Sequence, residues 1–185
     1  GVTAYQYDAQ GRVTQKTAYA HRLKNDPPHQ CLTLRDMACV PGSDDRTSSY
    51  YYDAAGRLQA EVNGEGAATA YRYDAEGHLI DTIRYKNKAT SPYTGDWKTD
   101  APSVVKNGDI HTHSLYNAAG LKIADMDAEH YLTEYRYDAR GLLIETIAYN
   151  TPLVDVPLES TALDDWRPSP HANDHHTIYR YNDVS

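Results

Sequence analysis

The sequence predicts an all-β protein built from tandem antiparallel hairpins, and two observations carry that prediction. A pattern written Tyr-x-Tyr-Asp-x-x-Gly-x-Leu recurs along the chain, and the copies at 71–79 and 135–143 lie 64 positions apart. Tyr-x-Tyr has the period of two that puts both rings on one face of a strand, and Asp followed three residues later by Gly is typical of a tight turn. Because repetition at a fixed period indicates a repeat architecture, we expect one continuous repeat array over residues 1–185.

The copies are recognised by the positions that they share. The second Tyr of the pattern falls at positions 7, 52, 73, 116, 137 and 181, so the spacing alternates and one unit of about 64 residues holds two copies. The residues that define the pattern are Tyr5, Tyr7, Asp8, Gly11, Tyr52, Asp53, Gly56, Tyr71, Tyr73, Asp74, Gly77, Tyr116, Asn117, Gly120, Tyr135, Tyr137, Asp138, Gly141, Tyr179 and Tyr181. We interpret them as structural, because a catalytic carboxylate repeated on every hairpin makes little chemical sense.

The turn predicts the backbone and the faces of the strands around it. Each Gly is expected at positive φ in a short hairpin loop that is often followed by a β-bulge. After the turn, Leu143, Ile147 and Tyr149 are predicted to share a face, as are the equivalent residues 64 positions earlier. Asp81 and Glu145 interrupt that face, and the sequence does not show what either carboxylate meets.

Paired copies of the pattern organise the chain into meanders that are separated by long inserts. The meanders cover about 46–85 and 110–149, the partial units cover 1–19 and 175–185, and the inserts cover 20–45, 86–109 and 150–174. Both ends fall inside the repeat, so we expect the chain to be a piece of a longer array. The inserts are rich in Pro, Asp, Asn and Ser and are long enough to hold short helices, which we expect in 33–40 and 157–166.

Two residue types in the inserts leave alternatives open. Trp97 and Trp166 occupy comparable inserts, where they either anchor the insert on the sheet or form a stacking platform for a sugar or peptide. Cys31 and Cys39, the only cysteines, are either a disulfide, which fits an oxidising compartment, or two free thiols. Without His at ligand spacing, they make a weak case for zinc.

Composition excludes several classes of function. The chain has 17 Tyr and no Phe, which favours rings with one buried side and a hydroxyl that finds a polar partner. Low hydropathy is also typical of disorder, but the strand and turn patterns agree with each other. A net charge of −8 argues against nucleic acid as a partner, and no run of 18 apolar residues exists to span a membrane.

The histidines and carboxylates predict neither catalysis nor cofactor binding. His111 and His113 lie on one face of a predicted strand, and His171, His175 and His176 cluster near the end. Neither group has a carboxylate or Cys at a spacing typical of metal ligands. Because no nucleophile or phosphate-loop motif is present either, we predict no catalytic, cofactor or metal site and no enzyme activity.

Two copies of the pattern, "YYYDAAGRL" at 50–58 and "YQYDAQGRV" at 5–13, resemble the YD repeat of the RHS-repeat proteins. The resemblance covers all the meanders, with Asn117 and Asn182 in place of the turn Asp as mild departures. It implies that the strands wind into part of a large β-shell, which in toxin members of the family encloses a C-terminal effector. Related repeats occur in teneurins and in insecticidal toxin complexes.

The resemblance also implies a function for the chain. We expect a structural shell or scaffold section of a large secreted or surface-exposed bacterial protein, which encloses or displays a toxin or effector module. The expected partners are neighbouring repeats of the same protein, an enclosed effector and, for an isolated piece, other copies that pair edge to edge. The alternative is a section of a cell-surface adhesin that binds glycans through Trp97, Trp166 and exposed Tyr.

Overall fold

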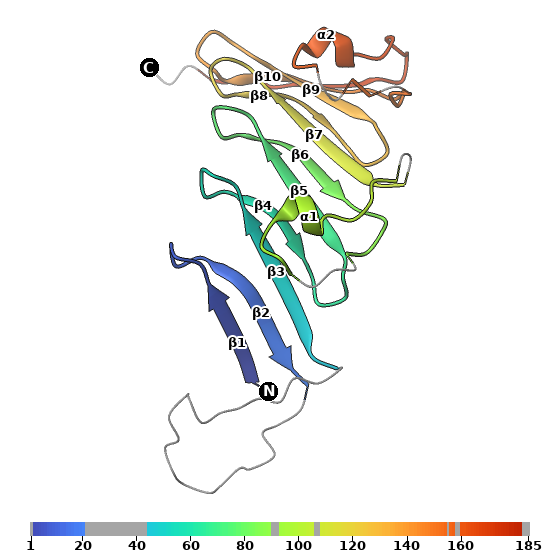
Figure 1. The fold of residues 1–185 in the computed structure, drawn as a ribbon. Helices are drawn as coiled ribbons and strands as arrows, with labels where there is room; N and C mark the ends of the chain where they lie inside the picture. Colours follow the sequence, from blue (N-terminus) through green and yellow to red (C-terminus); the bar gives the residue numbers. More distant parts are fainter. Residues whose placement is uncertain are drawn as a thin grey trace, which may run out of the picture. The chain divides into compact units, whose positions relative to one another are not determined.

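A computed structural model describes residues 2–20, 44–89, 93–105, 108–154, 156–157 and 160–182 (Figure 1). Eleven strands form one antiparallel sheet, and their order in the sheet follows their order in the chain. The two helices among these residues, α1 (Trp97–Asp100) and α2 (Leu163–Trp166), are single turns. Neither approaches the length or the apolar character that a membrane-crossing helix requires. The predicted fold class is therefore confirmed.

The strand boundaries repeat along the chain. The strands are β1 (Val2–Tyr7), β2 (Val13–Tyr19), β3 (Arg46–Tyr52), β4 (Leu58–Val62), β5 (Ala68–Tyr73), β6 (Leu79–Arg84), β7 (Ile110–Tyr116), β8 (Lys122–Met126), β9 (Leu132–Tyr137), β10 (Leu143–Ala148) and β11 (His175–Ile178). Each boundary of β7–β10 lies 64 positions after its counterpart in β3–β6, from 46 and 110 at the start to 84 and 148 at the end. The sequence repeat is thus also a repeat of secondary structure.

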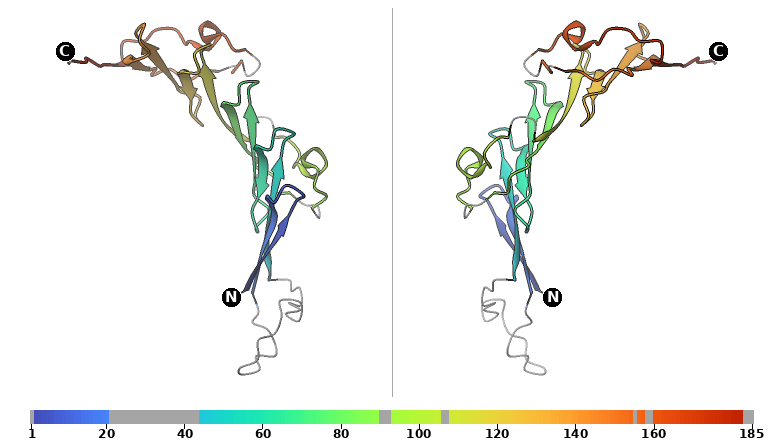
Figure 2. Two further views of the ribbon diagram at one scale, coloured as in Figure 1. Left: turned by 90° about the vertical axis from the view of Figure 1, so that its left-hand side faces the viewer. Right: turned by 90° about the vertical axis from the view of Figure 1, so that its right-hand side faces the viewer.

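By its internal contacts the chain divides into two units. The first comprises Gly1–Ala70 and Arg84–Asp109, and the second comprises Tyr71–Ile83 and Ile110–Ser185. In the first unit Figure 2 shows α1 beside one face of the strands, and in the second it shows α2 in the same relation to β7–β9. Buried apolar residues occur in both units, and those of the second unit form one cluster that includes Trp166 of α2. The buried apolar residues are Tyr51, Ala60, Ala68, Ala70 and Trp97 in the first unit, and Leu115, Ala124, Met126, Leu132, Ile147, Tyr149 and Trp166 in the second.

The turns of the motif copies up to residue 141 are each held by their own Asp or, at position 117, Asn. The Asp138 carboxylate accepts backbone N–H groups of Arg140 and Leu142 at 2.9 Å each, and the Gly141 N–H donates to the Asp138 carbonyl at 2.9 Å. Gly141 has φ 80° and Gly77 has φ 97°, as predicted. These contacts occupy the repeated carboxylates with the backbone of their own turns.

A β-bulge follows the turn, and it corrects one prediction about faces. In the β9–β10 pair Leu143 lies opposite Tyr137, but Glu145 lies opposite Arg136 and Ile147 opposite Glu134. The extra residue of the bulge reverses the alternation after Leu143. The prediction that Leu143 and Ile147 share a face is therefore wrong, and Ile147 is instead on the face of Glu145.

Tyrosine hydroxyls connect successive motif copies. The donor is the hydroxyl of the second Tyr of one copy. The acceptor is a backbone carbonyl of the preceding copy, at the residue two positions after the turn Gly. These pairs are Tyr52 and Val13 at 3.0 Å, Tyr116 and Leu79 at 3.4 Å, Tyr137 and Lys122 at 2.7 Å, and Tyr181 and Leu143 at 2.9 Å. Phe has no group that makes this bond, which explains why the chain uses Tyr and not Phe at these positions.

Candidate functional site: the insert anchors and the carboxylates between strands

Each insert is closed at its base by an aspartate. The first residue of the insert donates its backbone N–H to the carboxylate of an Asp near the end of the insert. The pairs are Ala20 and Asp45 at 2.9 Å, Lys86 and Asp109 at 2.8 Å, and Asn150 and Asp174 at 2.8 Å. The last two inserts thus leave the sheet from equivalent corners, directly after Tyr85 and Tyr149, as predicted.

A second backbone contact docks each of the last two inserts on the turn that precedes it. The Ala89 N–H donates to the Gly66 carbonyl at 2.9 Å, and the Leu153 N–H donates to the His130 carbonyl at 3.0 Å. Gly66 and His130 are the positive-φ residues of equivalent turns, with φ 83° and 68°. The insert path is therefore fixed by backbone bonds that repeat with the sheet.

Trp97 anchors the insert of the first unit. Its ring lies 5.1 Å from the Tyr51 ring and 5.8 Å from the Tyr85 ring, and the residue is buried. The buried Asp100, in the same helix, accepts hydrogen bonds from the Tyr51 hydroxyl at 2.9 Å and the Thr94 hydroxyl at 2.7 Å. Burial, together with the bond to Asp100, raises the pKa of Tyr51. A tyrosine of the sheet thus holds the insert by its ring and its hydroxyl.

Trp166 anchors the insert of the second unit. It is 0% exposed, stacks on His113 with 4.6 Å between ring centroids, and donates its indole N–H to the Ser160 carbonyl at 3.0 Å. Both tryptophans are thus packed in the interior, and neither presents a ring face for a ligand to stack on. The helix α2 covers only the end of the predicted 157–166 helix. Cys31, Cys39 and the predicted helix at 33–40 lie outside the described residues.

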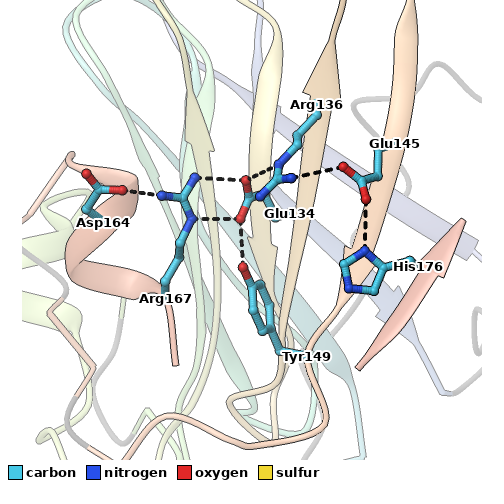
Figure 3. Close-up of polar contacts among 7 residues, drawn as sticks. All are labelled: Glu134, Arg136, Glu145, Tyr149, Asp164, Arg167 and His176. Carbon is cyan, nitrogen blue, oxygen red and sulfur yellow. Dashed lines mark hydrogen bonds and ion pairs between the residues drawn. The ribbon is translucent and has the colours of Figure 1, made fainter. Parts of the chain in front are cut away.

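The centre of the second unit holds a buried carboxylate, Glu134, that is 1% exposed (Figure 3). It accepts two hydrogen bonds from Arg167, one from Arg136 and one from the Tyr149 hydroxyl, all at 2.8 Å. Burial alone would raise the pKa of Glu134, but the bonds from Arg167, Arg136 and Tyr149 outweigh it and lower the pKa to about 2. Burial and the bond to Glu134 raise the pKa of Tyr149 to about 12. Glu134 is therefore ionised and joins the insert, through Arg167, to β9.

The polar chain continues from Glu134 across two more strands. The Arg136 guanidinium also lies 3.0 Å from one oxygen of Glu145, whose other oxygen lies 2.8 Å from Nδ1 of His176 in β11 (Figure 3). The hydrogen bond with His176 is the main reason that the pKa of Glu145 is lowered. Glu145, which interrupts the apolar pattern in the sequence, thus contacts His176 of the next motif copy.

Asp81, the residue 64 positions before Glu145, has similar neighbours at longer distances. Its carboxylate is 1% exposed and lies 3.6 Å from Arg72, 3.6 Å from His111 Nδ1 and 4.0 Å from His113 Nδ1. Among the described residues neither carboxylate oxygen of Asp81 has a hydrogen-bond partner, nor has Nδ1 of either histidine. In that part of the chain no three His, Cys, Asp or Glu side chains are arranged to hold a metal ion.

Comparison with known proteins agrees with this geometry. Residues 52–90 match the family model for the RHS repeat. This segment carries an RHS repeat. In sequence, no curated protein is significantly similar to the chain.

Solved structures of Tc toxins share the fold. The crystal structure of TcdB2-TccC3-Cdc42 has a TM-score of 0.52 and 18% identity, over 80% of this chain and 6% of that chain. A Photorhabdus luminescens Tc holotoxin pore has a TM-score of 0.50 and 19% identity, over the same shares. The chain thus spans about 6% of the length of the chains that it matches, and at these identities the likeness shows the fold alone.

The sequence pattern predicted the positions of most motif residues but gave no indication of the Glu134 network. The motif tyrosines up to Tyr137 lie in strands, as the pattern predicts, whereas Tyr179 and Tyr181 follow the end of β11 at Ile178. Glu134 and Arg167 are 33 positions apart and in different elements, so no local pattern joins them. One signal was available, because Glu134 is a charged residue at the position where the preceding RHS repeat has Ala70.

Proposed function

We propose that the chain is a section of an RHS-type β-scaffold that encloses or displays a toxin or effector module of a larger bacterial protein. The observation that carries this proposal is the strand order, in which eleven strands pair in sequence with no crossover. Such an array grows by adding repeats, because each strand covers the open backbone edge of its neighbour. The fold likeness to Tc toxin structures supports the same role.

The polar groups of the repeats support a structural role and not a catalytic one. The turn carboxylates bind the backbone of their own turns, and the motif tyrosines donate to carbonyls of the neighbouring copy. Groups engaged in this way are not available to bind or activate a substrate. The alternative adhesin role has no observation in its favour, because both Trp97 and Trp166 are buried.

The partners that we propose are further repeats at the two edges of the sheet. β1 and β11 each have one neighbour in the sheet. Tyr5 and Tyr7, on β1, are 48% and 58% exposed, which suits residues that an additional strand would cover. In an isolated chain the same edges would pair with other copies. A secreted or cell-surface location follows from the proposed toxin-scaffold role.

Electron cryomicroscopy of the longer protein that carries this chain tests the proposal. We expect the repeats to form a hollow β-shell with separate density for an enclosed or attached module. Limited proteolysis should then release that module only after the shell is unfolded or cut. An extended protein with no enclosed or displayed module would contradict the proposal.

A further inference from the structure

A carboxylate on one strand lies near a histidine on the next strand at two places in the sheet, between β6 and β7 and between β10 and β11. Asp81 and Glu145 each lie eight positions after the second Tyr of a motif, at 73 and 137. His111 and His176 each lie five positions before the second Tyr of the next motif, at 116 and 181. The same pairing of residue types thus occurs twice, at equivalent places in the repeat.

The pair on β10 and β11 is a formed contact. His176 lies opposite Ile147 in the strand register, and its Nδ1 is 2.8 Å from Glu145. The other charged groups around the pair are Arg136, which holds the second oxygen of Glu145, and Asp174, which precedes β11 and lies near His176. A histidine that is positively charged here donates an N–H and opposes the carboxylate charge.

The pair on β6 and β7 is buried and incomplete. Asp81 has Arg72 on β5 and both His111 and His113 on β7 within 4.0 Å, yet it accepts no hydrogen bond among the described residues. Trp166 covers His113 from the insert side. An ionised buried carboxylate without hydrogen bonds is costly, and a protonated imidazole at 3.6 Å relieves that cost after a small movement.

We propose that these histidine–carboxylate pairs form a protonation-dependent clasp between consecutive meanders, which holds β6 to β7 and β10 to β11 more tightly at mildly acidic than at mildly alkaline pH. The carboxylate must be ionised, so the clasp weakens in acid, and the bond with His176, which lowers the pKa of Glu145, moves this limit below the ordinary range of a Glu, about 4. The histidine must be protonated, so the clasp also weakens as the pH rises through the range in which histidines titrate, about 5 to 8. The clasp is therefore tightest between these limits.

The chain contains its own uncharged control. At the equivalent positions of β2 and β3 the residues are Gln15 and Thr47, neither of which titrates. These strands are joined by a Thr17–Thr47 hydroxyl bond of 2.9 Å and by a Gln15–Ser49 contact of 3.5 Å. The β2–β3 pair should therefore hold equally well across the pH range in which the clasp changes.

Amide hydrogen exchange of the 185-residue chain between pH 5.5 and 8, corrected for the intrinsic pH dependence of exchange, tests the clasp. We expect protection in β6 and β7 to fall about tenfold or more as the pH rises, because Asp81 is buried. In β10 and β11 we expect a fall of about two- to fivefold, because His176 is half exposed. Protection in β2 and β3 should not change.

Four variants make the test specific. Glu145→Gln and His176→Gln should each abolish the pH dependence in β11, while His175→Gln should retain it, because His175 is exposed and makes no contact with Glu145. Asp81→Asn should abolish it in β7. Should that variant fail to fold, the β11 variants decide alone. An unchanged pH dependence in Glu145→Gln, or an equal one in β2 and β3, would overturn the proposal.

Discussion

Arg167 binds Glu134 through two parallel hydrogen bonds of 2.8 Å, each from a different nitrogen to a different carboxylate oxygen. This geometry is the strongest that an arginine and a carboxylate form. It joins the insert that contains α2 to the centre of β9. The preceding repeat has Ala70 at the position of Glu134, so the first unit lacks this ion pair and uses Tyr51 and Asp100 in its insert anchor.

Replacing Arg167 should therefore destabilise the second unit. Arg167→Met leaves the buried Glu134 with two of its three partners, and we expect the free energy of unfolding to fall by roughly 2–3 kcal/mol. Urea denaturation measures the change. Asp164→Asn is the matched control, because Asp164 contacts the same guanidinium but its side chain is 85% exposed. If Asp164→Asn lowered the free energy of unfolding as much as Arg167→Met, the Arg167–Glu134 pair would not be the cause of the loss.

The same network predicts a loss of stability in acid. The pKa of Glu134 is lowered to about 2 in the folded chain, whereas it is near 4.3 in an unfolded chain. Its contribution of roughly 2–3 kcal/mol is present above about pH 4.5 and is lost as the pH falls toward 2. The free energy of unfolding of Glu134→Gln should consequently depend less on pH between 5 and 2 than that of the parent. Parallel curves for the two proteins would show that Glu134 is not the acid-sensitive group.

Substitution of a turn glycine should cost stability through the backbone. Gly141 has φ 80°, and a Cβ there would meet only Leu121 Cδ1, at 3.6 Å. Gly141→Val and Gly77→Val should each lower the free energy of unfolding by roughly 1–3 kcal/mol, because a β-branched residue disfavours positive φ. Urea denaturation of each variant provides the measurement. An unchanged free energy of unfolding in Gly141→Val would contradict the positive φ of this turn.

The reverse substitution is available at His130, which has φ 68° and is the only non-glycine residue with positive φ in the described part of the chain. His130→Gly removes the backbone strain but also a 3.3 Å contact between the His130 ring and the Leu153 carbonyl. We expect a net stabilisation of up to about 1 kcal/mol, measured by thermal or urea unfolding. Any net loss of stability would mean that the ring contact outweighs the strain.

The hydroxyl of Tyr137 should contribute to the stability of the sheet. Tyr137→Phe removes its 2.7 Å bond to the Lys122 carbonyl and should cost about 1 kcal/mol in urea denaturation. Tyr131→Phe is the control, because Tyr131 is 40% exposed and its hydroxyl makes no hydrogen bond among the described residues. If both substitutions changed the free energy of unfolding equally, the Tyr137 hydrogen bond would not explain why the motif uses Tyr.

Local chemistry explains which features could be predicted from the sequence. Asp138 and Gly141 lie in one turn, so their spacing alone defines the loop and its positive φ. The face of Ile147 was predicted wrongly because a bulge inserts one residue after the turn, and the motif does not state which strand absorbs it. The contacts of Glu145 with His176 and of Glu134 with Arg167 join residues more than 30 positions apart, and only the folded register brings those partners together.

We interpret the 64-residue repeat as the structural unit of a single sheet. Inserting a second copy of residues 74–137 directly after Tyr137 tests it, because the junction restores the sequence Tyr-Asp of the motif. A unit added in register should extend the sheet, as neighbouring repeats share one core. A copy of residues 74–138 inserted after Asp138 is the control, since its one additional residue disturbs the turn and the register.

The decisive measurement is the dependence of unfolding free energy on urea concentration, whose slope grows with the surface that unfolding exposes. We expect one cooperative transition for the in-register insertion, with a slope about a third larger than that of the parent. For the control we expect a smaller slope or a second transition. A parent-like slope for the in-register insertion, or identical curves for the two insertions, would contradict the claim that the repeat is the unit of the fold.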